Sequence, residues 1–205
     1  MTVSLNGALV AIAADFVGRY APWQGIQLRP NPSGGGVFVA STDAGKLAFL
    51  GFDPAGKGDE EMVLLPTPDL LKNTRPLKSA ERFLELDGQT ARCSKVLKTT
   101  TQTVEIPITR SAAEAPDLVG AMKKVAEQWG KDVPDCTTAG NFNAGYLARS
   151  FKAIEAMGSS ITLSHLNGGP LRVEAADHTA LVLVMPETAR PIPPLPEFLI
   201  AFGNS

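Results

Sequence analysis

The stretch 141–186 constrains the fold more than any other part of the chain, and it begins with a helical pattern. Leu147, Phe151 and Ile154 recur at spacings of four and three residues. Side chains at these spacings share one face of a helix, so one side of this segment is expected to pack against a core.

The predicted helix has clear ends, because Asn143 is a suitable N-cap and Gly158 a suitable C-terminal stop. Three short apolar runs follow it, separated by turn residues, at 161–165, 171–175 and 181–185. The first two alternate in polarity, as half-buried strands do, and the third is an uninterrupted apolar run ended by Pro186. The order helix, strand, strand, strand predicts an α+β unit.

Two further helices are predicted in the first 110 residues. One begins after Ser4 as its N-cap and has an apolar face formed by Leu5, Leu9, Ile12 and Phe16. The other opens on Thr67-Pro68-Asp69, which combines a cap, a proline at the first position and an acid in the first turn. Strands are expected around these helices, at 23–28, 37–40, 46–52, 61–65, 83–86, 90–97 and 102–106.

Charge and cysteine content narrow the class of protein. The net charge of −2 excludes a polycationic nucleic-acid-binding arm, although basic faces on a neutral body remain open. The sequence contains no run of 18 apolar residues, so no membrane span is predicted. No secretion signal is recognisable either. Cys93 and Cys136 lack metal-ligand spacing and a chain of this size needs no disulfide, so a cytoplasmic location is expected.

No catalytic constellation is recognisable. His165 and His178 lie near predicted strand ends without an organised serine, cysteine or carboxylate partner, so structural or surface roles are expected. The run Asp59-Glu60-Glu61 is more typical of a solvated strand entry than of a metal site. The glycines at 34–36 lack a following helix and a Lys-Ser or Lys-Thr pair, which favours a hairpin turn over a phosphate-binding loop. Neither a catalytic site nor a cofactor or metal is predicted.

Three separated stretches resemble one known family. The Phe142-Asn143-x-x-Tyr146-Leu147 helix, the hairpin and the last strand ending in Met185-Pro186 resemble the C-terminal half-domain of bacterial DNA polymerase sliding clamps, the DNA polymerase III beta subunit family. The segment 40–48, Ala-Ser-Thr-Asp-Ala-Gly-Lys-Leu-Ala, resembles the clamp segment A-T-D-G-x-R-L-A. Pro116-Asp117 falls where clamps have a Pro-Asp pair before their last domain.

The resemblance implies a DNA-clamp-like α+β fold with one complete clamp domain and an abbreviated second one. The expected boundaries are 1–110 for the complete domain, 111–190 for the abbreviated domain, and 191–205 for a Pro-rich link and apolar C-terminal tail. The second domain departs from the family because an amphipathic helix, with Leu118, Met122, Val125 and Trp129 on one face, stands where clamps have an extended connector. The shortness of the chain favours a divergent, phage-encoded member.

Two binding surfaces follow from the resemblance. Basic side chains on helices would face duplex DNA and contact phosphates without reading bases; the candidates are Lys72, Arg75, Lys123, Lys124, Arg149 and Lys152. We expect the last four of these to project on one common side of the molecule; ordinary solvated helix faces are the alternative. An apolar pocket would bind short peptides of a DNA polymerase or other clients; its candidates are Trp23, Thr42, Gly45, Leu47, Pro116, Leu183, Met185 and Pro186.

Three functional interpretations remain open at the level of sequence. The first is a non-enzymatic sliding clamp or polymerase processivity factor; clamp rings contain six similar domains, so a two-domain chain would form a homo-oligomer of three copies. The second is a clamp-fold protein-interaction module that does not encircle DNA. The third is an unrelated α+β protein or small enzyme.

The segment 191–205 raises a separate hypothesis. Four prolines between 191 and 196 predict a stiff, extended link, and Phe198, Leu199, Ile200 and Phe202 are too apolar to remain in water. The segment is expected to dock in an apolar groove, either in the chain's own peptide pocket or on a neighbouring subunit. One more strand packed on the core is the alternative.

Overall fold

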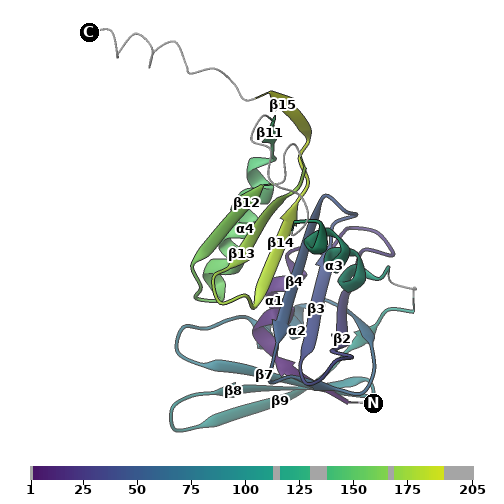
Figure 1. Cartoon of the computed structure of the whole chain (residues 1–205). Coiled ribbons are helices and arrows are strands. Elements are labelled where there is room, and N and C mark those ends of the chain that lie inside the picture. Colours follow the sequence, from purple (N-terminus) through teal and green to yellow (C-terminus); the bar gives the residue numbers. More distant parts are fainter. Residues whose placement is uncertain (1, 113–115, 130–137, 166–168, 192–205) are drawn as a thin grey trace.

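The computed structural model describes residues 2–112, 116–129, 138–165 and 169–191 (Figure 1). Helices separate runs of consecutive strands along the described chain. In order they are β1 (Thr2–Asn6), α1 (Gly7–Ala14), β2 (Ile26–Pro30), β3 (Val37–Thr42), β4 (Leu47–Asp53), β5 (Lys57–Gly58), β6 (Met62–Leu65), α2 (Pro68–Thr74), β7 (Glu81–Asp87), β8 (Thr90–Val96), β9 (Thr101–Pro107), β10 (Thr109–Arg110), α3 (Leu118–Trp129), β11 (Thr138–Asn141), α4 (Ala144–Ala156), β12 (Ile161–His165), β13 (Leu171–Ala175), β14 (Ala180–Val184) and β15 (Thr188–Pro191).

The start of the chain differs from the sequence prediction. The first helix is capped by Asn6, whose side chain accepts a hydrogen bond from the amide of Ala8, so Ser4 is not its N-cap. Ser4 and Leu5 belong instead to β1, where Leu5 lies opposite Leu84 of β7. The apolar spacing extended the helix too far because Leu5 is buried in the same core as the helix while lying in a strand.

The caps predicted for the other helices are confirmed. Thr67 accepts a hydrogen bond from the amide of Leu70 at the start of α2, and Asn143 accepts from the amides of Gly145 and Tyr146 at the start of α4. The buried face of α4 is shifted from the predicted one: Ser150, Ala153 and Ile154 are buried, whereas Phe151 is 36% exposed.

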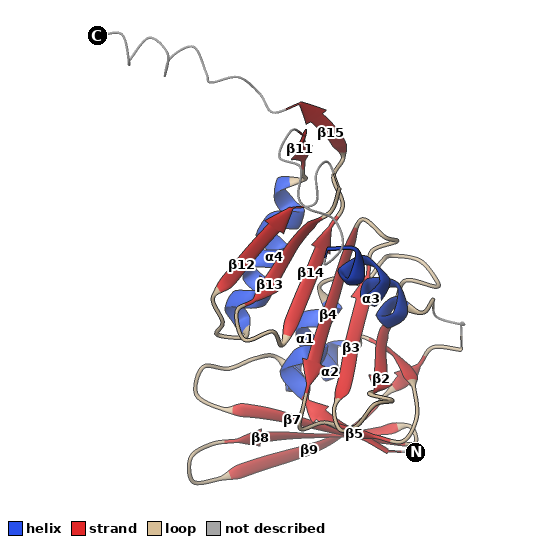
Figure 2. Cartoon of the chain, viewed as in Figure 1, coloured by secondary structure: helices blue, strands red, loops and turns tan. Residues whose placement is uncertain are grey.

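Two large sheets and one small one form the scaffold (Figure 2). The five-stranded sheet has the order β5-β1-β7-β8-β9, and the eight-stranded sheet has the order β10-β6-β2-β3-β4-β14-β13-β12. Strands β11 and β15 pair with each other beyond one end of the larger sheet. The predicted α+β class is confirmed.

The eight-stranded sheet is continuous because β14 pairs antiparallel with β4, so residues far apart in the sequence share one sheet. Leu47 lies opposite Val184, and Phe49 lies opposite Val182. Immediately beyond β14, the amide of Met185 donates to the carbonyl of Lys46 (2.9 Å), which extends the ladder by one bond.

Helices cover both faces of the eight-stranded sheet (Figure 1). Ser41 of β3 donates its hydroxyl to the carbonyl of Ala13 in α1 (2.7 Å), so this face of β3 carries α1. Strand residues alternate between faces, so Ala40 and its partner Gln27 on β2 point the other way. There the amide of Leu118, the first residue of α3, donates to Gln27 Oε1 (3.3 Å). Helix α3 therefore lies on the face opposite α1.

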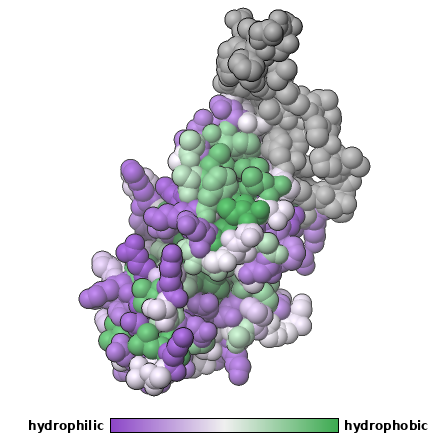
Figure 3. All heavy atoms as spheres, turned by 90° about the vertical axis from the view of Figure 1, so that its left-hand side faces the viewer, coloured by the Kyte–Doolittle hydropathy of each residue, from purple (hydrophilic) through white to green (hydrophobic). Residues whose placement is uncertain are grey.

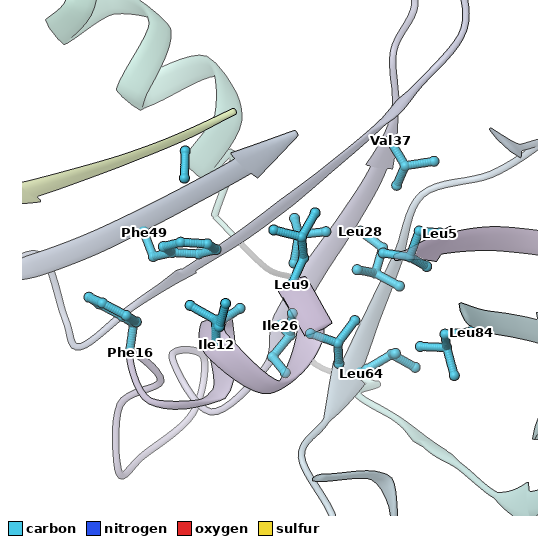
Figure 4. Packing of buried hydrophobic residues seen from close by; sticks show 14 of the residues in the cluster. Leu5, Leu9, Ile12, Phe16, Ile26, Leu28, Val37, Phe49, Leu64 and Leu84 are labelled. Atoms are coloured by element: carbon cyan, nitrogen blue, oxygen red, sulfur yellow. The ribbon is translucent and has the colours of Figure 1, made fainter. Parts of the chain in front are cut away.

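The main core lies on the α1 face, between this sheet, the helices and the five-stranded sheet (Figure 4). Phe16, just after α1, stacks on Phe49 with ring centroids 5.3 Å apart. Ile154 of α4 and Val182 of β14 belong to the same buried cluster, so α4 shares the α1 face. Fully burying one such side chain is worth about 1.5–3 kcal/mol, so this shared core couples α4 and β14 to the preceding elements.

Among the described residues, no helix is long and apolar enough to cross a membrane.

Candidate functional site

A groove on the α1 face gathers basic side chains from two helices. It has a volume of about 640 Å³, and its basic lining residues are Lys72 and Arg75 near the end of α2 and Lys152 on α4. Small residues of α1 and α4, including Ala11 and Ala156, line the space between them. One acidic residue, Asp15 at the end of α1, also lines the groove, so three cations face one anion there.

The local sequence explains why α2 places both of its basic residues in this groove. Lys72 and Arg75 are three positions apart, so they lie on the same side of the helix. Arg75 already leaves the helical conformation, with ψ 131°, because the following Pro76 disfavours a helical residue before it. Buried Leu70 anchors the opposite side of α2 in the core.

Helix α4 places Lys152 in the groove and Arg149 one turn away. Lys152 is exposed, whereas Arg149 is half-buried, with its guanidinium carbon 5.8 Å from the centre of the Tyr146 ring. A guanidinium over an aromatic ring is attracted by the ring quadrupole. Arg149 therefore contributes positive charge near the groove without being among the residues that line it.

The expectation that Lys123, Lys124, Arg149 and Lys152 share one side of the molecule is wrong. Lys123 and Lys124 are on α3, on the opposite face of the eight-stranded sheet from α4. This placement could not be predicted because amphipathicity shows which face of a helix is buried but not which face of a sheet the helix covers.

The second candidate site is built around the turn 42–47, between β3 and β4. Thr42 donates its hydroxyl to the carbonyl of Leu47 (2.8 Å) and accepts from the amide of Gly45 (3.0 Å). Asp43 accepts from the amide of Leu47 (2.8 Å). Gly45 has φ +86°, a value that favours glycine. These bonds give the turn a fixed shape.

Part of the predicted peptide pocket is interior in this structure. Thr42, Leu47 and Leu183 are buried. Leu47 belongs to the core on the α1 face, whereas Leu183 lies opposite Ala48 and so points to the other face of the sheet. These two leucines therefore cannot line one pocket as predicted.

Four accessible residues of the predicted pocket lie at this turn. Gly45 and Met185 are exposed, Met185 by 42%, and Trp23 and Pro186 are half-buried. A Cβ added at Gly18 would lie 2.7 Å from Cβ of Trp23 and 3.6 Å from Cα of Asp43, which places Trp23 beside the turn 42–47. The ladder bond from Met185 to Lys46 places Met185 at the same turn.

Pro116 lies in another region of the sheet. The next residue, Asp117, forms an ion pair with Arg29 of β2 (2.6 Å), and β3 separates β2 from β4. The structure therefore brings Trp23, Gly45, Met185 and Pro186 to the turn but leaves Pro116 beside β2.

Tyr146 of α4 interacts with Asp43 at this turn, and neither residue was predicted as part of a site. Burial, together with the charge and hydrogen bonding of Asp43, raises the pKa of Tyr146. Asn143 also donates to Glu187, just beyond Pro186 (3.2 Å). Tyr146 and Asn143 thus tie the start of α4 to both sides of the pocket. The spacing of Asn143 and Tyr146 in the sequence was the available signal.

The described part of the chain contains no group of three or more His, Cys, Asp or Glu residues placed to hold a metal ion. His178 is exposed at the β13–β14 turn, where its Nδ1 lies 2.8 Å from Glu174, which Arg172 also contacts. This agrees with a surface role for His178. His165, Cys136 and residues 192–205 lie outside the residues whose side chains the structure describes.

Antiparallel sheets packed around helices, with a second sheet unit joined edge to edge through β4 and β14, define a DNA-clamp-like fold. Solved bacterial sliding clamps share it. The DNA polymerase sliding clamp from Pseudomonas aeruginosa, solved with a ligand, aligns with 91% of this chain and 65% of its own length, with a TM-score of 0.57 and 13% identity. The DNA polymerase III subunit beta from Borrelia burgdorferi, in complex with a natural product, aligns with 92% of this chain and 64% of its own length, with a TM-score of 0.57 and 10% identity.

The fold predicted from the sequence resemblance is therefore confirmed. The chain spans slightly less than two thirds of the length of these clamps, which agrees with an abbreviated version of the fold. No protein-family model matches the sequence, and no curated protein matches it either.

Proposed function

We propose that this protein is a non-enzymatic, clamp-like DNA-binding protein that contacts duplex DNA through the groove between α1, α2 and α4. The observation that supports this most directly is the convergence of Lys72, Arg75 and Lys152, from two helices, on one groove. Arg149 adds a fourth positive charge one turn along α4.

Lysine and arginine on helices suit the DNA backbone because phosphate contacts release condensed counterions and carry no sequence information. Such an interaction is salt-dependent and indifferent to sequence, which is what a processivity factor requires. Lys123 and Lys124 are excluded from this proposal because α3 lies on the other face of the sheet.

A comparison of two double variants tests the DNA proposal. Lys72→Ala with Lys152→Ala removes two charges from the groove, whereas Lys123→Ala with Lys124→Ala removes two exposed charges from α3 and is the matched control. We expect the groove variant to bind duplex DNA more weakly and to reduce the slope of log K against log salt concentration by about 1.8, from about 0.9 per phosphate contact. Binding should remain independent of DNA sequence.

The control variant should retain the affinity and the slope of the unmodified chain. Equal weakening in both variants would mean that DNA responds only to net charge, and the groove proposal would be wrong.

We also propose that the accessible part of the peptide pocket, formed by Trp23, Gly45, Met185 and Pro186, binds a short client peptide rich in leucine and phenylalanine. The unbranched, polarizable side chain of Met185 adapts to varied apolar partners, and Trp23 offers a large apolar surface beside it. The hydrogen-bonded turn 42–47 would hold these groups in place.

A second candidate function is a clamp-fold interaction module that does not encircle DNA. The observation in its favour is that α3 precedes β11, where a complete first half of a second domain would supply further strands. Strand edges are what could join copies of the chain into a continuous ring, and the described residues between β10 and α4 supply no such strand beyond β11.

A further inference from the structure

Strand β12 is the last strand in the order of the eight-stranded sheet, and its exposed edge is apolar. It pairs with β13 on one side, and among the described residues no strand pairs with the other. Ile161 is 39% exposed and Leu163 54% exposed, and Ile161 lines one depression together with the exposed Phe151 of α4. Figure 3 views the molecule from this side, and a broad hydrophobic area occupies its upper half. Exposed apolar edges are normally covered or protected by charge, and β12 carries no acidic or lysine residue.

The fold itself shows what such an edge requires. Strand β7 follows α2 and opens the antiparallel series β7-β8-β9, just as β12 follows α4 and opens β12-β13-β14. The outer side of β7 is covered by β1, which pairs Val3 with Leu86 and Leu5 with Leu84. All four of these side chains are buried. A strand with apolar residues at alternate positions therefore completes the equivalent edge.

Ile161 and Leu163 lie on the core-facing side of β12, where an added strand would also place its apolar residues. Ile161 lies opposite Ala175 and Leu163 opposite Val173, and both partners are buried in the main core. The α4 face of β12 thus continues the core outward. A depression of about 660 Å³, lined in part by Phe151 and Ile161, lies between α4 and this edge.

We propose that residues 197–202, Glu-Phe-Leu-Ile-Ala-Phe, add to β12 as a further antiparallel strand of the same molecule. Phe198, Ile200 and Phe202 alternate, so in a strand they share one face, as Val3 and Leu5 do in β1. That face would cover Ile161, Leu163 and Phe151. The prolines all precede this segment, so each of its residues retains an amide for the ladder.

Chain connectivity favours this occupant over another protein. Strand β15 pairs with β11, which leads directly into the start of α4, so both lie at the end of the sheet where β12 finishes (Figure 1). Five residues, 192–196, separate β15 from the proposed strand, and an extended proline-rich link of that length spans roughly 15 Å. A segment entering from this end runs antiparallel to β12, as β1 runs to β7.

Hydrogen exchange in the full-length chain tests the proposal. Ile200→Ser with Phe202→Ser places polar groups on the core-facing side, and we expect the amides of β12 to exchange at least about tenfold faster than in the unmodified chain. Leu199→Ser with Ala201→Ser is the matched control, because this face would lie on the side of the exposed Thr162 and should leave exchange within about twofold.

Equal exchange of β12 in both variants and the unmodified chain would overturn the proposal. The molecular mass distinguishes the source of the strand. If the amides of β12 are protected from exchange while the mass in solution is 21.6 kDa, and this protection does not change with concentration, the strand comes from the same molecule. Protection that appears only in a dimer and disappears on dilution would assign the strand to a second copy and overturn the intramolecular form. The proposal does not depend on DNA binding, so the two can fail separately.

Discussion

At the scale of single residues, the turn between β13 and β14 shows how local hydrogen bonds set a charge. Asp177 accepts hydrogen bonds from the hydroxyl (2.7 Å) and the amide (3.1 Å) of Thr179. These bonds stabilise the carboxylate, and the hydroxyl bond is the main cause of the lowered pKa of Asp177. The same turn contains His178 with φ +59°, so these bonds also help to hold an unusual backbone conformation.

Thr179→Val should raise the pKa of Asp177 toward its ordinary value of about 3.9, because the strongest hydrogen bond is removed. A carboxylate whose folded pKa lies below its unfolded pKa stabilises the fold above the unfolded value and loses this effect as the pH falls through the folded value. The free energy of unfolding of the variant should therefore be lower at neutral pH, and it should fall less steeply as the pH is lowered. An NMR titration of Asp177 measures the shift. Thr188→Val, on exposed β15, should leave it unchanged, and an unaltered pKa in Thr179→Val would contradict the assignment.

At the scale of elements, α3 is held on its sheet face by a few polar contacts around one buried glutamine. Gln27 donates to Glu61 (2.5 Å) and accepts from the amide of Leu118, while Arg29 pairs with Asp117. Met122 of α3 is buried, on the side of the helix that packs against the sheet. These contacts fix where α3 begins, and they explain how an amphipathic helix can occupy a face that α1 and α4 leave open.

Gln27→Leu should loosen α3 without unfolding the sheet. The substitution keeps a side chain of similar size but removes the bond from the amide of Leu118, which retains the carbonyl of Pro116 (2.8 Å), and the bond to Glu61. Each such bond is worth about 0.5–1.5 kcal/mol. We expect the amides of residues 118–129 to exchange faster while those of β3 remain protected. Gln102→Leu, on the exposed face of β9, is the control. Unchanged exchange of α3 in Gln27→Leu would show that packing alone holds the helix.

At the scale of the whole molecule, the question is whether copies of the chain can form a ring. Within the chain, β4 joins β14 edge to edge. Strand β9 ends the β7-β8-β9 series as β14 ends the β12-β13-β14 series, so it is the equivalent edge for a neighbouring copy. The described residues between β10 and α4 contain α3 and β11 but no strand equivalent to β4 that could pair with it.

We therefore expect a mass of 21.6 kDa in solution, measured by light scattering at physiological salt. A stable species of three times that mass would show that a ring forms through a different contact, and it would favour an encircling clamp over an interaction module. DNA binding through the helix-side groove is compatible with either result.

The local structure of most elements could be predicted from the sequence alone. Caps such as Thr67 and Asn143 act within four residues, and the alternation in 161–165 and 171–175 predicted two strands with their observed bounds. These signals are readable because they depend on neighbouring residues only. The clamp-like fold also followed, since three separated motifs resembled one family in the right order.

Which elements share a face became clear only from the packing of distant segments. Burial of Leu5 is the same in a helix or a strand, so its spacing predicted the wrong element. Lys123 and Lys152 both lie on amphipathic helices, yet their helices, α3 and α4, cover opposite faces of the sheet. Leu47 and Leu183 were predicted together, but the register of β4 with β14 points them to opposite faces. The physical reason is common to all three: periodicity identifies a buried side, whereas pairing register and packing between distant segments determine what that side is buried against.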